Sequence, residues 1–401
     1  MKIAVLGFGT VGSGVYELVR DNKEIISKNA GEEVSTKYIL DIIDFSDRPD
    51  AQLFTKNFDD IVNDDEVSIV VETIGGLEPA FTFSKKALEK GKTVITSNKE
   101  LVATHGNELI DLAIKNGAKY LFEASVGGGI PIIRPLFHCI VSNQIEGVSG
   151  ILNGTTNYIL TKMFKNGESF ETALLAAQQN GYAERDPSAD VDGHDTCKKI
   201  CILSSIISGK SVDFKNVYTE GISKITLEDT KYAQEMGYSI KLIGECKRKD
   251  SDNLEVHVAP MLVSKEKMLS AIEDVYNGIV VNGGVTGDTM NYGRGAGKMP
   301  TASAVVADVV EAVKNQTVSY MRPWEKAEKN IVINHNEYVR SFFVRVKSEG
   351  YDKTVLPKIL QSKEIYDGEI GFITEKISYQ DICKKLSESG LQVVSLIEVM
   401  D

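Results

Sequence analysis

The chain has 401 residues, more than one ordinary hydrophobic core holds, and at roughly 100 to 200 residues per domain we expect three domains. Its 42% hydrophobic and 25% charged residues are globular values that argue against wholesale disorder. Its net charge of −12 disfavours nucleic acid as a partner, because contacts to phosphates need clustered lysines and arginines.

The sequence also lacks the patterns of a secreted or membrane protein. Residues 1–6 enter an apolar strand pattern without a basic leader region, and no stretch approaches the roughly 18 uninterrupted apolar residues of a spanning helix. The 5 cysteines include no CxxC pair, so we expect thiols in a reducing compartment. Cys197 and Cys201 could form the edge of a metal site, but no second pair accompanies them, which favours structural thiols. These patterns predict a cytoplasmic protein.

The first third of the chain alternates apolar runs with helical stretches. A strand at Lys2–Leu6 and a helix at Val11–Val19 precede a second strand at Tyr38–Phe45. The further candidates are strands at Val67–Glu72, Thr93–Ile95 and Tyr120–Ala124, and helices at Ala80–Lys90 and Gly106–Asn116. This alternation predicts an α/β fold, with a Rossmann-type, doubly wound parallel sheet over residues 1–130 that a helix at 300–316 completes.

The alternation of apolar runs and helical stretches ends after Pro131. Helical stretches at Phe170–Asn180 and Asp195–Ile207 flank an acidic turn, and a glycine-rich segment at Gly283–Gly297 precedes a helical run at Thr301–Lys314. We therefore expect a second, α+β domain over residues 131–299. After a linker at Ser319–Trp324, a small α+β domain is expected over residues 325–401. Its candidate strands are Arg340–Val346, Ile370–Thr374 and Leu391–Val399, and its candidate helices are Thr354–Gln361 and Tyr379–Glu388.

The first strand ends in a glycine-rich turn that opens a helix. In a G-x-G-x-x-G turn of this kind, Gly7 permits the tight turn, Gly9 lets the backbone approach a pyrophosphate, and Gly12 allows close packing of helix on strand. The helix N-terminus then stabilises the diphosphate through its unpaired N–H groups and its dipole. A glycine-rich turn without a ligand is the alternative, which the strand, spacing and helix together disfavour. The residues expected to bind a nicotinamide dinucleotide are Gly7, Phe8, Gly9, Thr10, Val11 and Gly12.

Two further cofactor contacts are expected at the carboxyl ends of strands. Asp44 lies near the end of the second strand, where an acid would accept hydrogen bonds from the adenosine ribose and repel a 2′-phosphate, which favours NAD. Arg48 could instead pair with the 2′-phosphate of NADP, and two solvated loop charges remain an alternative to both roles. Thr73 follows the strand Val67–Glu72, so we expect it to contact the ribose or the nicotinamide.

A carboxylate and a lysine share one face of the expected helix Asp195–Ile207. Asp195 and Lys199 are at positions i and i+4, so the carboxylate can orient and balance the ammonium. A weak surface ion pair is the alternative, although the apolar residues that follow indicate a buried helix. Reduction of an aldehyde by a hydride leaves an alkoxide, and a desolvated lysine ammonium can donate the proton that it needs. Lys199 is therefore the expected acid, and His194 is its nearest rival.

Several segments together resemble one enzyme family. They are Gly7–Gly12, Ser97–Lys99, Glu123–Pro131, Gly150–Leu160, Gly181–Lys199 and Gly293–Ala304. In this order they resemble homoserine dehydrogenases over residues 1–320. The resemblance implies the reversible reduction of L-aspartate 4-semialdehyde to L-homoserine with NAD or NADP, in threonine and methionine biosynthesis. It also implies a homo-oligomer, a dimer or a tetramer, because the second domain of such enzymes commonly forms a dimer interface.

The resemblance assigns roles to further residues. Lys199 would be the proton donor, Asp195 its substrate-binding partner, and Lys99 would lie near nicotinamide and substrate. Glu184 would bind the amino group of the substrate, with Asp190 as a further substrate-binding residue. An aldehyde that carries an ammonium and a carboxylate needs an acid to hold one end and a base to hold the other. The resemblance also implies that Gly181 and Gly287 lie against the cofactor, and that backbone carbonyls of the segment with Glu123, Val126, Gly128 and Ile130 coordinate a sodium ion.

The chain departs from the family pattern in two places. Family members that prefer NADP often carry Arg at the end of the second strand, where Ile43 stands here. Residues 325–401 have the size and order of an ACT regulatory domain, but Ser348–Asp352 lacks the Asp-x-Pro-Gly ligand turn. Threonine feedback is therefore an open hypothesis.

Three other functions are alternatives to this interpretation. Another Rossmann dehydrogenase, acting on a small hydroxy acid, would turn over substrates without an amino group. Aspartate semialdehyde dehydrogenase needs an activated cysteine, and Cys139 has only His138 beside it. A catalytically dead, cofactor-binding amino-acid sensor is disfavoured because Lys99, Glu184, Asp195 and Lys199, the residues to which the resemblance assigns roles in catalysis and substrate binding, are all present.

Overall fold

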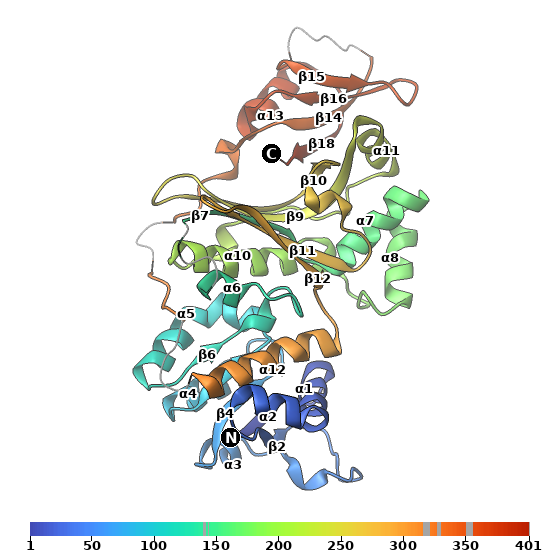
Figure 1. Cartoon of the computed structure of the whole chain (residues 1–401). Coiled ribbons are helices and arrows are strands. Elements are labelled where there is room, and N and C mark those ends of the chain that lie inside the picture. Colours follow the sequence, from blue (N-terminus) through green and yellow to red (C-terminus); the bar gives the residue numbers. More distant parts are fainter. Residues whose placement is uncertain (139–141, 143, 316–320, 327–329, 350–355, 401) are drawn as a thin grey trace. The chain divides into compact units, whose positions relative to one another are not determined.

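The computed structural model describes residues 1–138, 142, 144–315, 321–326, 330–349 and 356–400. Contacts divide the chain into two compact units. The first unit comprises Met1–Gln144, Cys201–Asp213 and Asn291–Glu328, and the second comprises Ile145–Ile200, Phe214–Met290 and Lys329–Asp401. In Figure 1 the first unit carries the N-terminus, and the second carries the C-terminal strands.

The first unit contains a 6-stranded sheet with the order β3-β2-β1-β4-β5-β6. All of its pairings are parallel. This strand order is that of a doubly wound dinucleotide-binding sheet, so the predicted Rossmann fold is confirmed. Its strands are β1 (Lys2–Leu6), β2 (Ser35–Leu40), β3 (Phe54–Thr55), β4 (Val67–Glu72), β5 (Thr93–Thr96) and β6 (Tyr120–Leu121).

Helices flank this sheet, and one of them comes from far along the chain. Helix α12 packs beside α1, as Figure 1 shows in orange and blue. The two can approach closely because Gly14 has no side chain: a Cβ there would lie 3.0 Å from Cβ of Ala302. Lys298 at the start of α12 also pairs with Glu17 at 2.7 Å. The helices are α1 (Thr10–Asp21), α2 (Lys23–Ala30), α3 (Asp59–Val62), α4 (Ala80–Glu89), α5 (Lys99–Lys115), α6 (Ile133–His138) and α12 (Lys298–Lys314).

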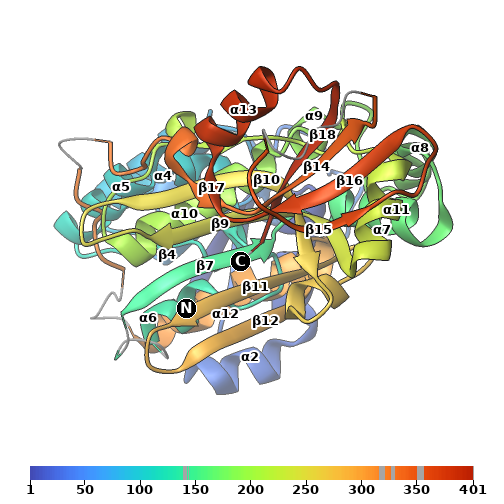
Figure 2. The same ribbon diagram turned by 90° about the horizontal axis from the view of Figure 1, so that it is seen from above.

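The second unit is built on one mixed, 10-stranded sheet, which Figure 2 shows from above. Its order is β12-β11-β7-β9-β10-β18-β14-β16-β15, and β8 pairs with β10 off this path. The central strands are β7 (Ile145–Ile151), β8 (Tyr218–Thr219), β9 (Tyr238–Arg248), β10 (Leu254–Ser264), β11 (Tyr276–Gly283) and β12 (Gly287–Arg294). The later strands are β14 (Phe342–Lys347), β15 (Ile359–Lys363), β16 (Glu369–Thr374) and β18 (Val393–Val399), while β13 (Val339–Arg340) and β17 (Ile377–Ser378) form a separate pair.

The helices of this unit include the one that carries the expected acid. They are α7 (Gly154–Asn166), α8 (Phe170–Gln179), α9 (Ser188–Val191), α10 (His194–Ser208, whose last residues belong to the first unit), α11 (Leu227–Met236) and α13 (Tyr379–Glu388). Helix α7 begins where Asn153 accepts a hydrogen bond from Thr156 N at 2.9 Å, an N-cap.

The C-terminal strands join the central sheet through β18. This strand pairs in parallel with β10, where Glu398 lies opposite Met261, and antiparallel with β14. Charged groups are buried beside the junction. The Glu398 carboxylate contacts Nε2 of His335 at 2.6 Å, and Arg340 Nη2 lies 2.6 Å from Glu245 Oε2 on β9. A hydrophobic core centred on Phe342 and Phe372 fills the space between these strands and α13.

Some expected bounds differ from the observed elements. The strand expected at Tyr38–Phe45 is wrong in its bounds, because β2 ends at Leu40 and Ile42 is 90% exposed. The helix expected at Thr354–Gln361 is wrong: the described part of that range turns into strand β15 at Ile359. The strand at Tyr120–Ala124 is shorter than expected, and the helix at Gly106–Asn116 begins earlier, at Lys99.

Parts of other expectations fall on residues that the structure does not describe. They are position 316 of the completing helix, Ser319 and Tyr320 of the linker, Cys139, and residues 350–352 of the loop compared with the ACT ligand turn. Among the described residues, no helix combines the length and apolar character needed to cross a bilayer.

Candidate active site

The glycine-rich turn has the geometry that a pyrophosphate needs. Gly7 has φ +88°, and its N–H donates to Leu40 O at 2.8 Å. A Cβ on Gly12 would lie 1.9 Å from Gly7 O, whereas nothing lies within 4 Å of the Cβ position of Gly9. Gly12 therefore permits the helix to pack on the turn, and Gly9 leaves an open backbone at the N-terminus of α1. The turn fits a dinucleotide.

An acid that sequence reasoning missed contacts this turn. Asp41, the residue directly after β2, accepts the backbone N–H of Phe8 at 2.7 Å through Oδ2. Its Oδ1 accepts the N–H of Ile43 at 3.0 Å. The expected acid, Asp44, is instead exposed, and the N–H of Ser46 bonded to it lowers its pKa. The sequence alone favours Asp44, because the apolar Ile42 and Ile43 extend the predicted strand past Asp41, although both isoleucines are exposed.

Aromatic rings and an ion pair surround Phe8. Its ring meets those of Phe45 and Phe54 edge-on, at centroid distances of 5.2 and 5.0 Å. The guanidinium of Arg48 lies over the Phe8 ring, 5.0 Å from the centroid, and forms two hydrogen bonds with Asp50 at 2.8 and 2.9 Å. Arg48 is thus already engaged by a carboxylate, which weakens the case for it as a 2′-phosphate ligand.

The loops after β4 and β5 carry two more expected residues. The hydroxyl of Thr73 donates to Leu6 O at 2.9 Å and to Gly7 O at 3.0 Å, so it fastens its loop to the glycine-rich turn. Lys99 is the first residue of α5 and is half-buried, after the N-cap Asn98. A helix N-terminus favours anions, so helix stability does not explain a lysine at this position. This placement agrees with a role for Lys99 at the ligand edge of the sheet.

The segment expected to bind sodium is held at both ends by carboxyl groups. Glu123 is buried, and its Oε1 accepts the N–H groups of Ile132 at 2.6 Å and Ile133 at 2.9 Å. Its own N–H donates to Asp308 Oδ2 at 2.9 Å, and burial raises the pKa of Asp308 to about 8. Gly128 has φ +53°, and a Cβ there would lie 2.4 Å from Gly295 O. Val126 and Ile130 within the segment are buried.

In the second unit, Lys199 and Asp195 lie next to each other on α10. Lys199 Nζ is 2.7 Å from Asp195 Oδ2 and donates to Leu152 O at 2.8 Å. Lys199 is 9% exposed and Asp195 5%, so this is a buried pair and not the alternative of a surface pair. The rival acid His194, at the start of the helix, is exposed.

An asparagine joins this pair to a second carboxylate. Asn153 Nδ2 donates to Asp195 Oδ2 at 2.9 Å and to Asp190 Oδ1 at 2.6 Å. Burial, and next the charge of Asp195, raise the pKa of Asp190. The structure therefore brings Asp190, Asp195 and Lys199 together, with Asn153 as a link that sequence reasoning did not single out.

The remaining expected residues of this unit are less enclosed. Glu184 is exposed in the turn between α8 and α9, and its carbonyl accepts from Gln178 at 3.1 Å. Gly181, at the start of that turn, has φ +72° and is exposed. Gly287 begins β12 with φ +70° and is exposed as well. Both glycines have backbone conformations that residues with a side chain rarely adopt.

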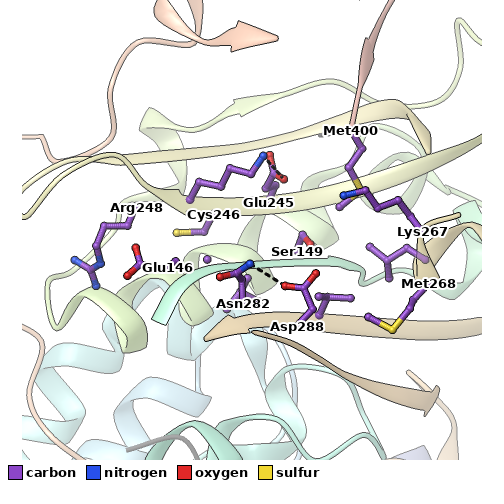
Figure 3. A pocket seen from close by; sticks show the side chains of 15 residues that line it. Glu146, Ser149, Glu245, Cys246, Arg248, Lys267, Met268, Asn282, Asp288 and Met400 are labelled. Atoms are coloured by element: carbon purple, nitrogen blue, oxygen red, sulfur yellow. Dashed lines mark hydrogen bonds and ion pairs between the residues drawn. The ribbon is translucent and has the colours of Figure 1, made fainter. Parts of the chain in front are cut away.

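Figure 3 shows a pocket on the face of the sheet turned away from α10. A Cβ on Gly244 of β9 would lie 2.9 Å from Thr196 of α10, and the next residue, Glu245, points to the opposite face and lines the pocket. Asn282 and Asp288 both line it, and Asn282 Nδ2 donates to Asp288 Oδ1 at 2.8 Å, the bond that Figure 3 marks with a dashed line. None of the residues expected at the active site lines this pocket.

Comparison with known proteins agrees with this geometry. A family model of the homoserine dehydrogenase NAD binding domain matches residues 7–123, and a homoserine dehydrogenase model matches residues 131–310. Homoserine dehydrogenase of Bacillus subtilis is 39% identical, covering 87% of this chain and 82% of its own length. That of Lactococcus lactis is 35% identical, covering 99% and 92%.

Solved structures show the same relationship. A homoserine dehydrogenase from Thiobacillus denitrificans has a TM-score of 0.92 at 34% identity, covering 100% of this chain and 98% of its own. A hyperthermophilic archaeal homoserine dehydrogenase in complex with NADPH has a TM-score of 0.67 at 28% identity, covering 78% and 97%.

The fold and the matched regions define an oxidoreductase with a Rossmann domain for a nicotinamide dinucleotide. Within that class, the chain belongs to the homoserine dehydrogenase family. The resemblance drawn from the sequence is confirmed, and the alternative of a hydroxy-acid dehydrogenase from another family is not supported.

Proposed function

We propose that this chain catalyses the reversible reduction of L-aspartate 4-semialdehyde to L-homoserine, with Lys199 as the proton donor. The observation that carries the proposal is the buried Lys199–Asp195 pair at 2.7 Å. A lysine ammonium has three protons. Among the described residues, Leu152 O and Asp195 accept two of them, so one remains for a substrate oxygen.

The bound nicotinamide would supply a hydride to the aldehyde carbon. The pair of electrons of the C=O bond then moves to oxygen, and Lys199 Nζ gives that oxygen its proton. Asp195 keeps the ammonium oriented throughout, and in the reverse direction the neutral amine removes the hydroxyl proton. Asp190 and Glu184 are the proposed anions for the substrate ammonium, and Lys99 is the proposed cation near nicotinamide and substrate.

For the cofactor we propose a preference for NAD over NADP. Asp41 lies at the end of β2, against the glycine-rich turn, where its carboxylate can accept the ribose hydroxyls and repel a 2′-phosphate. It takes the role first expected of Asp44. Arg48, the residue that could favour NADP, is paired with Asp50.

We also propose that carbonyls of Glu123, Val126, Gly128 and Ile130 bind a sodium ion. The left-handed conformation of Gly128 and the two carboxyl groups that hold the segment support this assignment, because a hard cation needs backbone oxygens held in fixed directions. The test is the dependence of activity on Na⁺ with choline as the control cation. Equal rates in both salts would contradict it.

The proposal extends to three broader properties. Residues 325–401 are proposed as an ACT-like regulatory domain, and activity titrated with millimolar threonine tests this. The chain is proposed to act in the cytoplasm, in threonine and methionine biosynthesis, as a homo-oligomer. Sedimentation of the purified protein distinguishes a monomer from a dimer or a tetramer.

The deciding experiment follows absorbance at the reduced-nicotinamide band. L-Homoserine is offered with NAD and, separately, with NADP, and 4-hydroxybutanoate serves as the control because it lacks only the amino group. We expect turnover with homoserine alone. Turnover of 4-hydroxybutanoate at a similar rate would reject the proposed binding of the ammonium, and cofactor binding without any turnover would favour the catalytically dead sensor.

A further inference from the structure

A buried carboxylate lies where strands β4 and β5 end side by side. Glu72, the last residue of β4, is 0% exposed and lies opposite Thr96, the last residue of β5. Its Oε1 accepts the N–H groups of Ile74 at 2.7 Å and Gly75 at 3.3 Å. Its Oε2 accepts the hydroxyl of Thr96 at 2.5 Å. Glu72 thus holds the loop after its own strand and the end of the neighbouring strand at once.

Thr96 and Asn98 extend this hydrogen-bond network and link it back to the loop at 73–76. The oxygen of the Thr96 hydroxyl accepts the N–H of Asn98 at 2.9 Å. Asn98 Nδ2 donates to Gly76 O at 2.6 Å, and its Oδ1 caps α5 by accepting Leu101 N at 3.1 Å. The loop at 73–76 and the start of α5 are therefore tied at two points.

Stability of the fold does not account for a carboxylate at this position. Burial raises the pKa of Glu72, which reports the cost of its charge in the core, and the hydrogen bonds from Thr96, Ile74 and Gly75 only oppose that shift. An apolar side chain at the end of a buried parallel strand would avoid this cost. Buried polar networks of this kind fix one arrangement of the backbone.

The two loops carry the groups that the reaction needs near each other. Thr73 lies on the first loop and fastens it to Gly7 of the glycine-rich turn. Lys99 directly follows Asn98 on the second. We propose that Glu72, through Thr96 and Asn98, is a positioning residue that sets the distance between Lys99 and the cofactor-binding loop. This inference rests on the proposed function, and it assigns Glu72 no contact with substrate.

The first test compares two identical substitutions on one strand. Thr96→Val removes the hydroxyl that bonds to Glu72, at nearly constant volume. Thr93→Val makes the same change at the other end of β5, where the side chain is partly buried. We expect Thr96→Val to lower kcat by about 10- to 100-fold, since displacements near 1 Å have effects of this size. The Kd of the cofactor should change less than about threefold, because the glycine-rich turn is intact. Thr93→Val should keep the wild-type kcat.

A second variant and a hydrogen-exchange measurement distinguish a positioning role of this network from a loss of folding. Thr96→Ser keeps the hydroxyl and should restore kcat to within about threefold of wild type. Amide hydrogen exchange without ligands should accelerate in Thr96→Val at Ile74 and Gly75, across the bridge, as well as at Asn98. A Thr96→Val protein that is folded, exchanges like wild type at Ile74 and Gly75, and turns over normally would overturn the inference.

The exchange measurement keeps this inference distinct from the proposed function. If the wild-type enzyme does not oxidise homoserine, the proposed function fails, and the exchange result still decides whether the loops are coupled. If the wild type is active and Thr96→Val is equally active, the positioning role alone fails. Glu72→Met supplies an independent variant: it removes both acceptor oxygens, so the N–H groups of Ile74 and Gly75 and the Thr96 hydroxyl all lose their bonds to residue 72, and the same kcat loss is expected.

Discussion

The ammonium of Lys199 lies 2.7 Å from the carboxylate of Asp195, one helical turn away, and both side chains are buried. The pair is connected through Asn153 to Asp190, so the acid sits in a hydrogen-bonded network and not on the surface of α10. Such a network fixes the direction of the remaining ammonium proton, which is the property that proton transfer to a nascent alkoxide requires.

Lys199→Met should lower kcat by at least two orders of magnitude and leave cofactor binding intact, because general acid catalysis contributes about 10² to 10⁴. Lys198→Met is the matched control: the Lys198 ammonium lies near the Phe214 ring, 5.8 Å from its centroid. Steady-state kinetics and fluorescence titration of the reduced cofactor measure the two effects. A near-normal rate in Lys199→Met would show that another group delivers the proton.

Cofactor preference should respond to Asp41 and not to Asp44. Asp41→Asn keeps an oxygen for the N–H of Phe8 but removes the charge, so kcat/KM with NADP relative to NAD should rise about tenfold, as expected for about 1.4 kcal/mol of repulsion. Asp44→Asn should leave the ratio unchanged because Asp44 is exposed and bonded to Ser46 N. The reverse pattern would reinstate Asp44 as the ribose ligand.

Alanine substitutions of Gly12 and Gly9 should have different effects on stability and on cofactor binding. Gly12→Ala would place a Cβ 1.9 Å from the Gly7 carbonyl oxygen, so it should lower the melting temperature by several degrees and abolish cofactor binding. Gly9→Ala meets nothing within 4 Å, so the protein should melt normally yet bind the cofactor at least tenfold more weakly. Calorimetry paired with cofactor titration separates the two. Normal cofactor affinity in Gly9→Ala would show that the pyrophosphate does not bind against Gly9.

Lys241 gives the stability of the second unit an alkaline pH dependence. Burial lowers its pKa to about 8 from an ordinary 10.5, so the unfolded chain binds more protons than the folded one between these values. Stability from this group therefore rises with pH across that window. Relative to Lys241→Met, the wild-type melting temperature should gain a few degrees from pH 8 to pH 10.5, since 1 kcal/mol shifts it by roughly 2 to 4 °C in domains of this size. Lys249→Met is the exposed control, and a constant difference across the window would contradict the assignment.

Much of the first unit could be predicted because its central strands β1, β4 and β5 are mostly buried on both faces. β1 and β4 are short aliphatic runs whose bounds the sequence predicted as observed. The sequence predicts the end of β2 too late, because Ile42 and Ile43 continue the apolar pattern although they are 90% and 61% exposed. Propensity does not distinguish an exposed apolar loop from a strand, since only tertiary contacts decide burial.

The strands of the second unit were harder to predict for a different reason. Lys241 and Glu245 interrupt the apolar pattern of β9, and both are buried there. Glu245 is tolerated because Arg340, far along the chain, pairs with it at 2.6 Å. Likewise, the spacing of Asp195 and Lys199 predicted their pairing on a helix, but Asn153, which joins them to Asp190, comes from a distant N-cap that no local pattern reveals.

Strand β18 is hydrogen-bonded to both β10 and β14. The C-terminal strands β14, β15, β16 and β18 are therefore part of the same sheet as β10. Truncation before residue 325 would uncover the edge of β10 at Met261 and Leu262, where β18 pairs, and would remove Arg340, the buried counter-ion of Glu245. An unprotected strand edge of this kind recruits other chains, so such a shortened protein should aggregate even though every residue of the Lys199 network remains in place.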